Sequence, residues 1–362
     1  MKGSNISVYA VILCGGRGER FWPASRRKMP KQFIRLFGPK SLTQQTSERI
    51  SGLCPLSRQL FVTPSEFVPL LTTEMKLPKA NLLVEPSGRN TAPAVALAAA
   101  HLSRNDPDAV MVVLPADHLI TQRREFIAAV RLAVEVASHG FLVTFGIRPT
   151  RPDTGYGYIH CGRRLFGSGR TTAHKVNAFR EKPDVATALR YTREKVYLWN
   201  SGMFVWRAEQ ILEALQQCLP DFHAELVRYR RTIGTPREVT ARLRLYRKAP
   251  PTSIDYAVME KAKNVAVVRA GFEWDDVGSW LALTRHLPKD ERGNVRRGTS
   301  VVKDTTGCVI DSDSGLIACL GVHDLVVVRS GMAVLVAHKD SLVDIKTLLT
   351  LIAEQKGASD YL

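Results

Sequence analysis

The chain has 362 residues, of which 45% are hydrophobic and 23% charged, values typical of a globular protein with a sizeable core. These values exclude a mainly disordered chain, and no apolar run reaches the ~18 residues that a membrane span needs. The 51 basic residues outnumber the 34 acidic ones and give a net charge of +17, which suggests an anionic partner such as a nucleic acid, a membrane surface or a phosphorylated small molecule.

The N-terminal half alternates short β-branched runs with helical patterns, which predicts an α/β fold with a mostly parallel, Rossmann-like sheet flanked by helices. Strands are expected at residues 8–13, 59–63, 81–84, 109–114 and 141–147, and helices at 41–50, 91–102 and 125–138. The alternation then loosens, with strands expected at 175–179, 198–205 and 264–269 and helices at 208–218 and 254–263.

From about residue 290 the pattern changes to short β runs at 300–303, 308–311, 316–321, 325–329 and 333–337, followed by a helix at 341–355. We therefore predict a catalytic domain at 1–288 and a small β-rich C-terminal domain at 289–362.

The six cysteines form no CxxC pair, which favours reduced thiols over a zinc site or a disulfide framework. With no convincing secretory signal, a cytoplasmic protein is expected.

A glycine-rich loop follows the first expected strand and contains Gly15, Gly16 and Gly18. Closely spaced glycines expose backbone N–H groups to which a phosphate can bind. The loop fits neither the dinucleotide pattern GxGxxG, because Phe21 stands at the third glycine position, nor a P-loop. Eight basic residues and one acidic residue lie between Arg17 and Lys40, an excess that suits a triphosphate whose leaving group must be neutralised.

Carboxylates stand at the ends of two expected strands. Asp117 follows a buried strand, at the edge where open α/β sheets bind their ligands, and Asp275 and Asp276 follow a second strand far along the chain. Two separated carboxylates near a phosphate loop are what Mg²⁺ requires, since it keeps its other positions for phosphate and water. For either aspartate alone, a helix cap is an equal alternative.

The chain resembles the mannose-1-phosphate guanylyltransferases of the sugar-phosphate nucleotidyltransferase family. The matching strings, in chain order, are GGRGERFWPASR with PKQF, EPSGRNTAPA, VLPADH, TGYGYI, AFREKPD, YLWNSGMFVW, SIDYAVMEK and WDDVGSW. The resemblance implies that GTP and α-D-mannose 1-phosphate are the substrates and that GDP-mannose and pyrophosphate are the products. The sugar phosphate is already mostly a dianion at neutral pH, so no general base is required.

The resemblance also implies roles for individual residues. Gly15, Gly16 and Gly18 would bind the triphosphate, Arg20 and Lys31 would stabilise charge on the α-phosphate and pyrophosphate, and Asp117 and Asp276 would hold Mg²⁺. Asp276 is preferred to Asp275 because the family pattern is Trp, a variable residue, then Asp-Val-Gly-Ser-Trp. Lys182 would bind the phosphate of the sugar, and Gly155, Glu181 and Asn200 would contact its hydroxyls.

Glu85 is the candidate residue for recognising the base, called here the base reader. A carboxylate accepts hydrogen bonds from both N1–H and N2–H₂ of guanine and disfavours a base without those donors. Arg89, Asn90 and Thr91 also belong to the expected nucleotide site. For Asn90 and Thr91, a helix-capping role competes evenly with ligand contact.

Three alternatives remain: a sister transferase with another sugar or base, a non-catalytic nucleotide-sugar-binding regulator, and a nucleic-acid-binding protein, which only the net charge suggests. We expect no nucleic-acid or membrane partner. The C-terminal segment resembles that of monofunctional family members, which can mediate a homodimer, and a second, isomerase activity is not expected. The basic stretch from Arg228 to Lys248 reads as helices with solvated faces and has no role implied by the family.

Overall fold

The computed structural model describes residues 6–362, and its contacts divide the chain into two compact units. The first, called here the α/β unit, contains residues 6–15, 46–116 and 120–274. The second, called here the loop unit, contains residues 16–45, 117–119 and 275–362. The loop unit therefore joins the glycine-rich loop and Asp117 to the C-terminal strands. The division of the chain near residue 288 stays a prediction.

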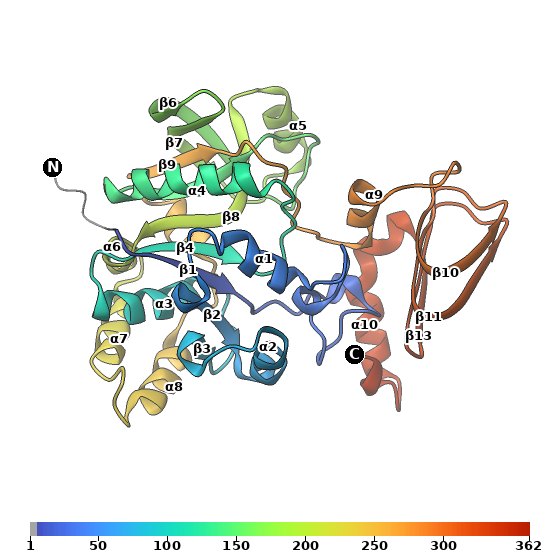
Figure 1. Ribbon diagram of the computed structural model, residues 1–362, viewed down its shortest axis with the longest axis horizontal. Coiled ribbons are helices and arrows are strands. Elements are labelled where there is room, and N and C mark those ends of the chain that lie inside the picture. Colours follow the sequence, from blue (N-terminus) through green and yellow to red (C-terminus); the bar gives the residue numbers. More distant parts are fainter. Residues whose placement is uncertain (1–5) are drawn as a thin grey trace. The chain divides into compact units, whose positions relative to one another are not determined.

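A nine-stranded sheet with the order β3-β2-β1-β4-β8-β5-β9-β7-β6 forms the centre of the α/β unit (Figure 1). Within it, β7 and β8 run against the other strands, which confirms the mostly parallel sheet. The strands are β1 Val8–Leu13, β2 Gln59–Pro64, β3 Leu82–Glu85, β4 Val110–Pro115, β5 Leu142–Ile147, β6 Tyr158–Ser168, β7 Thr171–Arg180, β8 Tyr197–Arg207 and β9 Val265–Arg269.

Both faces of this sheet are buried, because helices cover each of them. Successive side chains of a strand point to opposite faces. In the register of β1 with β4, Ala10 pairs with Val112 and Val11 with Val113. Val11 and Val113 pack on one face with α3, α6, α7 and α8, whereas Ala10 and Val112 pack on the other face with α4. The parallel strands bring the ends of β1 and β3 to the same edge of the sheet.

The helices of the protein vary in length from one turn to more than four turns. They are α1 Leu42–Ile50, α2 Val68–Met75, α3 Thr91–Asn105, α4 Arg123–Ser138, α5 Val185–Arg193, α6 Ala208–Cys218, α7 Pro220–Arg230, α8 Glu238–Lys248, α9 Leu283–His286 and α10 Ile345–Glu354. The small side chains of the alanine-rich α3 are almost all buried, which allows close packing against the sheet and α6.

Two expectations for the α/β unit differ from the structure. The helix expected at 254–263 is a single π-helical turn, Asp255–Met259. The long hairpin of β6 and β7 was expected only in its second strand, because its irregular pairing weakens the alternation of the sequence. Gly167 and Gly169 adopt φ values of 77° and 63° at the turn of this hairpin, a conformation that other residues rarely adopt.

The loop unit contains a second sheet of four strands in the order β10-β11-β12-β13, comprising β10 Val295–Lys303, β11 Val309–Leu320, β12 Leu325–Ser330 and β13 Ala333–His338. The first three strands are parallel and β13 is antiparallel. The two short runs expected at 308–311 and 316–321 form one strand, β11. Its pairing with β10 shifts at Gly298, where a Cβ would lie 2.1 Å from the carbonyl oxygen of Ser312.

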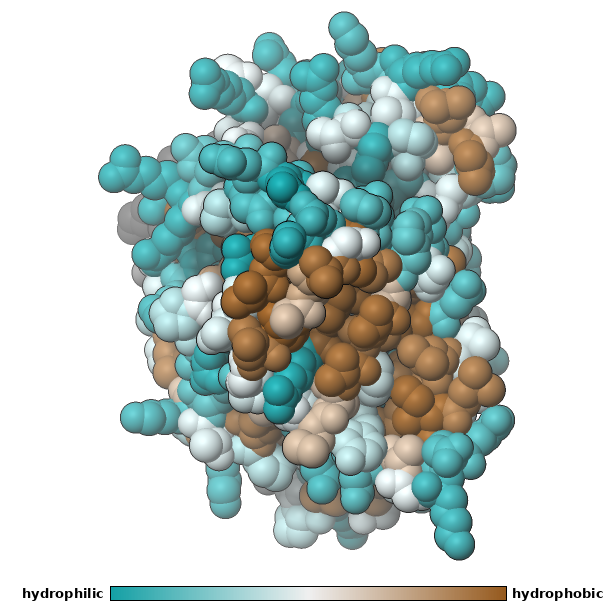
Figure 2. Space-filling view, turned by 90° about the vertical axis from the view of Figure 1, so that its right-hand side faces the viewer, coloured by the Kyte–Doolittle hydropathy of each residue, from teal (hydrophilic) through white to brown (hydrophobic). Residues whose placement is uncertain are grey.

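One face of this sheet packs in a core with α10 and the residues around Trp280. Several large apolar side chains remain exposed on β10, β11 and β13 or the turn before β13: Val301, Leu316, Leu320, Met332, Val334 and Val336. Figure 2 shows apolar residues gathered into a broad area on the side of the molecule that it presents. Among the residues described, no helix is long and apolar enough to cross a membrane.

Candidate active site

The glycine-rich loop of the loop unit is shaped around Lys31. Gly18 has a φ of 65°, and a Cβ at this position would lie 2.1 Å from the Cβ of Lys31. Any other residue would therefore displace the lysine, which is the physical reason for glycine at this position. A Cβ on Gly16 would meet nothing within 4 Å, so the room there is free for a ligand.

Lys31 begins a short 3-10 helix, Lys31–Phe33, and its side chain is only 7% exposed. Its ammonium nitrogen Nζ lies 2.7 Å from Asp117 Oδ2 and 2.6 Å from the carbonyl oxygen of Asp276. Three residues that are far apart in sequence thus meet at one cation. The sequence predicted all three for the site.

These residues line a pocket of about 510 Å³ in the loop unit, called here the phosphate pocket. Its lining comprises Arg17, Gly18, Glu19, Arg20, Phe21, Lys31, Asp117, His118, Asp276, Gly278 and Lys346. Among the described residues, the Arg20 guanidinium and the exposed Lys346 ammonium make no hydrogen bond or ion pair. Sequence reasoning missed Lys346, because nothing in the pattern of α10 indicates that its first turn reaches this loop.

The Asp117 side chain remains ionised beside Lys31. Burial acts to raise its pKa, but the charges of Lys31 and His118 and the hydrogen bond from Lys31 outweigh that effect. The pKa of Asp117 therefore lies below its ordinary value. A carboxylate at this position can bind a cation or orient Lys31 at neutral pH.

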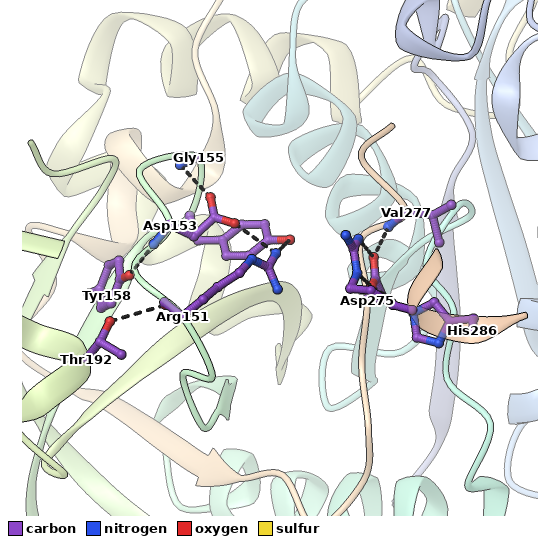
Figure 3. Close-up of polar contacts among 10 residues, drawn as sticks. Arg151, Asp153, Gly155, Tyr158, Thr192, Asp275, Val277 and His286 are labelled. Atoms are coloured by element: carbon purple, nitrogen blue, oxygen red, sulfur yellow. Dashed lines mark hydrogen bonds and ion pairs between the residues drawn. The ribbon is translucent and has the colours of Figure 1, made fainter. Parts of the chain in front are cut away.

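The neighbouring aspartates 275 and 276 have different surroundings. Asp275 accepts two hydrogen bonds from Arg285, at 2.6 and 2.9 Å, one from the backbone N–H of Val277, and one from His286 Nε2 at 2.8 Å (Figure 3). Although burial acts to raise its pKa, the His286 and Arg285 contacts hold it well below its ordinary value. Asp275 is therefore a structural anchor, whereas Asp276 lines the phosphate pocket.

The turn after Asp276 is held in a conformation that its residue types disfavour. Val277, a β-branched and buried residue, has a φ of 50°. Such a conformation costs on the order of 1–3 kcal/mol and persists only where the surroundings impose it. A Cβ on Gly278 would lie 3.0 Å from Asp276 Oδ2, so glycine leaves the space that this carboxylate occupies.

The phosphate pocket fits a divalent cation that takes part of its ligand set from a bound phosphate. Asp117 and Asp276 supply carboxylate oxygens to one pocket. The residues described contain no group of three or more His, Cys, Asp or Glu placed to hold a metal by themselves. This donor set suits Mg²⁺, which keeps several water or phosphate ligands, rather than a structural zinc site.

The base-reading residues expected from the sequence lie in the α/β unit. Glu85 ends β3 and is 4% exposed, and its Oε1 accepts a 3.1 Å hydrogen bond from the hydroxyl of Tyr246 on α8. A Cβ on Gly15 would lie 3.7 Å from the other oxygen, Oε2. Burial raises the pKa of Glu85 to about 7, although the Tyr246 hydrogen bond acts to lower it. Tyr246, within the basic stretch, had no sequence signal.

The residues after Glu85 form the start of α3. Asn90 has a φ of 68°, and its Oδ1 accepts from the backbone N–H of Thr91 at 2.8 Å. Thr91 Oγ1 accepts from the backbone N–H of Ile254 at 2.9 Å. Both side chains thus hold the protein's own backbone. The half-buried Arg89 makes no side-chain hydrogen bond or ion pair with the residues described.

The expected sugar-binding residues surround Gly157 in the α/β unit. Glu181 Oε2 is buried and makes no hydrogen bond with the protein, and a Cβ on Gly157 would lie 2.2 Å from it. Asn200 accepts from Thr144 Oγ1 at 2.9 Å and donates to Asp255 Oδ1 at 2.7 Å. Burial and the charge of Asp255 raise the pKa of Glu181 to about 7, against the opposing charge of Lys182.

The loop around Gly155 is ordered by Asp153 (Figure 3). Asp153 accepts from the Gly155 backbone N–H at 2.9 Å and from Arg151 at 2.8 Å, and its own N–H donates to the Tyr158 hydroxyl at 3.0 Å. Lys182 is exposed, with a φ of 45° just before a proline. Sequence reasoning missed Asp153 and Asp255, although both flank or lie within strings that matched the family.

A glycine loop against a buried lysine, with two carboxylates in the same basic pocket, defines a nucleotidyl-transferring enzyme. The chain belongs to the nucleotidyl transferase family, whose model matches residues 9–293, and residues 298–351 match the MannoseP isomerase/GMP-like beta-helix domain. Enzymes of this family generally use a divalent metal ion.

Individual relatives are similar over nearly the whole chain. The mannose-1-phosphate guanylyltransferase of Klebsiella pneumoniae is 41% identical over 97% of this chain and 75% of its own length. The alginate biosynthesis protein AlgA of Pseudomonas fluorescens is 39% identical over 95% of this chain and 72% of its own. The crystal structure of mannose-1-phosphate geranyltransferase from Thermus thermophilus superposes with a TM-score of 0.85 at 38% identity, covering 96% of this chain and 100% of that one.

Proposed function

We propose that the protein transfers GMP from GTP to α-D-mannose 1-phosphate and releases GDP-mannose and pyrophosphate. The observation that carries this proposal is the buried Lys31 between Asp117 and Asp276 in a pocket that also contains Arg20. The similarity to mannose-1-phosphate guanylyltransferases supports the choice of reaction and substrates.

The attacking group is a phosphate oxygen of the sugar phosphate, which at neutral pH is mostly a dianion. It forms a bond to the α-phosphorus of GTP while the bond to the pyrophosphate oxygen breaks in line. Arg20 and Lys31 stabilise the negative charge that grows on the α-phosphate and the leaving group, and the N–H groups of the Gly15–Gly18 loop bind phosphate oxygens. The proton balance requires no general base.

Asp117 and Asp276 would hold Mg²⁺, which supplies charge neutralisation to the triphosphate when bound. Asp117 also fixes the position of the Lys31 ammonium through their 2.7 Å contact. Because Lys31 is held from two sides, little conformational entropy is lost when it meets a phosphate.

We assign guanine reading to Glu85, with Arg89, Asn90 and Thr91 beside it. Tyr246 occupies one oxygen of the carboxylate, and the second oxygen has room on the side of Gly15. In the sugar site, the unpaired Oε2 of Glu181 needs a hydrogen-bond donor, and a sugar hydroxyl supplies one. Asn200 and the Gly155 loop would complete the contacts to the sugar, and Lys182 would bind its phosphate.

We also propose a cytoplasmic location, which the six free cysteines support, because reduced thiols are typical of that compartment.

A homodimer is proposed through the exposed apolar face formed by residues such as Val301, Leu320 and Val336. Sedimentation of the wild type and of the double variant Leu320→Glu/Val336→Glu tests this assembly. A wild type that sediments as a monomer contradicts it.

The reaction is tested by incubating the purified protein with Mg²⁺, mannose 1-phosphate and each of the four nucleoside triphosphates in turn, and measuring released pyrophosphate. Of the four nucleoside triphosphates, we expect only GTP to give rapid release of pyrophosphate. Equal release with glucose 1-phosphate would reassign the enzyme to another sugar, and release with none of the triphosphates would reject the proposed function.

A further inference from the structure

The hairpin of α7 and α8 forms a second basic pocket, separate from the phosphate pocket and wholly within the α/β unit. It measures about 660 Å³ and is called here the hairpin pocket. Its lining comprises Glu225, Arg228, Tyr229, Thr232, Pro236, Arg237, Thr240, Ala241, Arg244, Arg247 and Lys248. The basic stretch forms helices with exposed basic side chains, as expected from the sequence, and the two helices together enclose a concave surface.

The charges in the hairpin pocket do not balance. Its single acid, Glu225, is 6% exposed and contacts three cations: Arg228 at 2.6 Å, Arg244 at 3.2 Å and Lys248 at 2.6 Å. The hydrogen bond from Lys248 and the charges of Arg244 and Arg228 keep the pKa of Glu225 below its ordinary value, so one negative charge is shared by three positive ones.

Two further guanidinium groups in this pocket have no partner among the residues that the structure describes. Arg237 lies just before α8 and Arg247 near its end, and neither side chain makes a hydrogen bond or an ion pair with residues 6–362. Both are exposed at the rim. Guanidinium groups bind phosphate oxygens in pairs of parallel hydrogen bonds, which lysine cannot do.

We propose that the hairpin pocket is a second anion site, which binds a small ligand carrying two or more phosphate groups. The surplus of positive charge favours a multiply charged anion over a neutral or singly charged ligand. The volume of this open pocket is within the range of ordinary small-molecule sites, and its wall includes the apolar body of Tyr229 and Pro236, so it suits a compact ligand better than a long polymer. Free polyphosphate and a nucleoside diphosphate share this chemistry.

The hairpin pocket and the base reader Glu85 are both in contact with α8. Arg244 and Arg247 line the hairpin pocket, while Tyr246 between them is buried on the other side of the helix and donates its hydrogen bond to Glu85. A ligand that pulls on α8 therefore changes the position of the Tyr246 hydroxyl. Resting on the proposed function, we infer that this ligand changes the KM for GTP more than kcat.

Calorimetry with inorganic tripolyphosphate, without substrates, tests the site. The probe variant is Arg237→Ser/Arg247→Ser, which removes only the unpaired cations. Its matched control is Arg131→Ser/Arg231→Ser, which removes two exposed arginines outside both pockets and changes the net charge equally. We expect two tripolyphosphate sites per chain in the wild type and the control, and at least tenfold weaker binding at one of them in the probe variant.

Hydrogen exchange locates the site independently, with slower exchange of residues 228–248 expected when tripolyphosphate binds. The same titration with GDP distinguishes a nucleotide ligand from free polyphosphate. If the natural ligand is a nucleotide, GDP binds more tightly than tripolyphosphate. Equal binding by the probe variant and the control overturns the proposal. Tighter, salt-sensitive binding of duplex DNA at the same arginines overturns it in favour of a nucleic acid.

Steady-state kinetics test whether ligand binding in the hairpin pocket affects GTP binding through α8. We expect tripolyphosphate to alter the KM for GTP in the control by at least threefold more than in the probe variant. Equal responses in both variants reject the coupling through Tyr246. A protein with no transferase activity rejects the proposed function, whereas the calorimetry still decides whether the anion site exists.

Discussion

The Nζ atom of Lys31 lies 2.7 Å from Asp117 Oδ2, and the lysine side chain is almost fully buried, whereas the aspartate is 34% exposed. The exposed part of the pair is the aspartate, and both residues line the phosphate pocket. Asp117 therefore fixes the Lys31 ammonium in place before any ligand binds, and removing either member leaves the other charge without this partner.

Lys31→Ala and Asp117→Ala are each expected to lower turnover by at least a hundredfold while the protein stays folded. Under the proposed function, lysine removal takes away transition-state charge stabilisation, and aspartate removal frees the ammonium from its position and removes a proposed metal ligand. Pyrophosphate release and circular dichroism measure the two effects. The control Lys28→Ala removes an exposed cation of the same loop and should change turnover by less than twofold. Losses below tenfold in both variants, about 1.4 kcal/mol of barrier, would reject the assigned roles.

Glu85→Gln is expected to erode the preference for GTP over ATP, because the amide presents a donor where guanine requires an acceptor. The pKa of about 7 adds a pH dependence: as the pH falls through that value, Glu85 becomes protonated and the KM for GTP rises. Tyr246→Phe removes the hydrogen bond that lowers this pKa, so the rise should begin at a higher pH. An unchanged ratio of GTP to ATP rates in Glu85→Gln would remove Glu85 from base reading.

Protonation of Glu85 at low pH, which weakens GTP binding, should increase the stability of the folded protein. The pKa of this group is about 7 in the folded protein and 4.5 in its ordinary state, so the folded state binds the proton more tightly. The free energy of unfolding therefore falls as the pH rises from about 4.5 to about 7. Glu85→Gln lacks this penalty and should gain up to about 3 kcal/mol above pH 7 relative to the wild type. Urea unfolding at pH 5 and pH 8 measures the difference, and a gain equal at both pH values would contradict it.

Gly157→Ala is expected to raise the KM for mannose 1-phosphate at least tenfold and to leave the KM for GTP within twofold. The added Cβ would meet Glu181 Oε2 at 2.2 Å and displace the oxygen assigned to a sugar hydroxyl. Gly271→Ala is the matched control, since its Cβ would lie 4.0 Å from the nearest atom outside its chain neighbours, the carbonyl oxygen of Arg170. Equal effects of Gly157→Ala on both substrates would point to general misfolding instead of a local sugar site.

Lys346→Ala is expected to lower kcat/KM for GTP about tenfold, or ~1.4 kcal/mol, because it removes a cation from the lining of the phosphate pocket. Its side chain is exposed and makes no bond with the described protein residues, so thermal stability should not change. Lys356→Ala removes an equally exposed lysine beyond the same helix and serves as the control. If both variants behave alike, Lys346 has no part in phosphate binding.

The sequence predicted those elements best whose pattern is local. β1 and the start of α3 lie where expected, because a continuous apolar run and an Asn-Thr cap before an alanine-rich stretch leave few alternatives. Tyr246 and Lys346 could not be predicted, since the Tyr246–Glu85 contact and the place of Lys346 in the lining of the phosphate pocket both depend on segments far apart in the sequence. The difference between Asp275 and Asp276 likewise depends on Arg285 and His286, whose approach only the folded chain reveals.

The indole nitrogen of Trp22 donates a 2.7 Å hydrogen bond to the carbonyl oxygen of Tyr361, and Trp280 donates to the Trp22 backbone at 3.0 Å. During synthesis, the glycine motif leaves the ribosome hundreds of residues before these partners exist. The loop around Trp22 therefore cannot complete these hydrogen bonds until residue 361 has been synthesised. Enzyme activity should accordingly require residues up to Tyr361 to have left the ribosome, which in vitro translation of chains arrested before residue 340 measures.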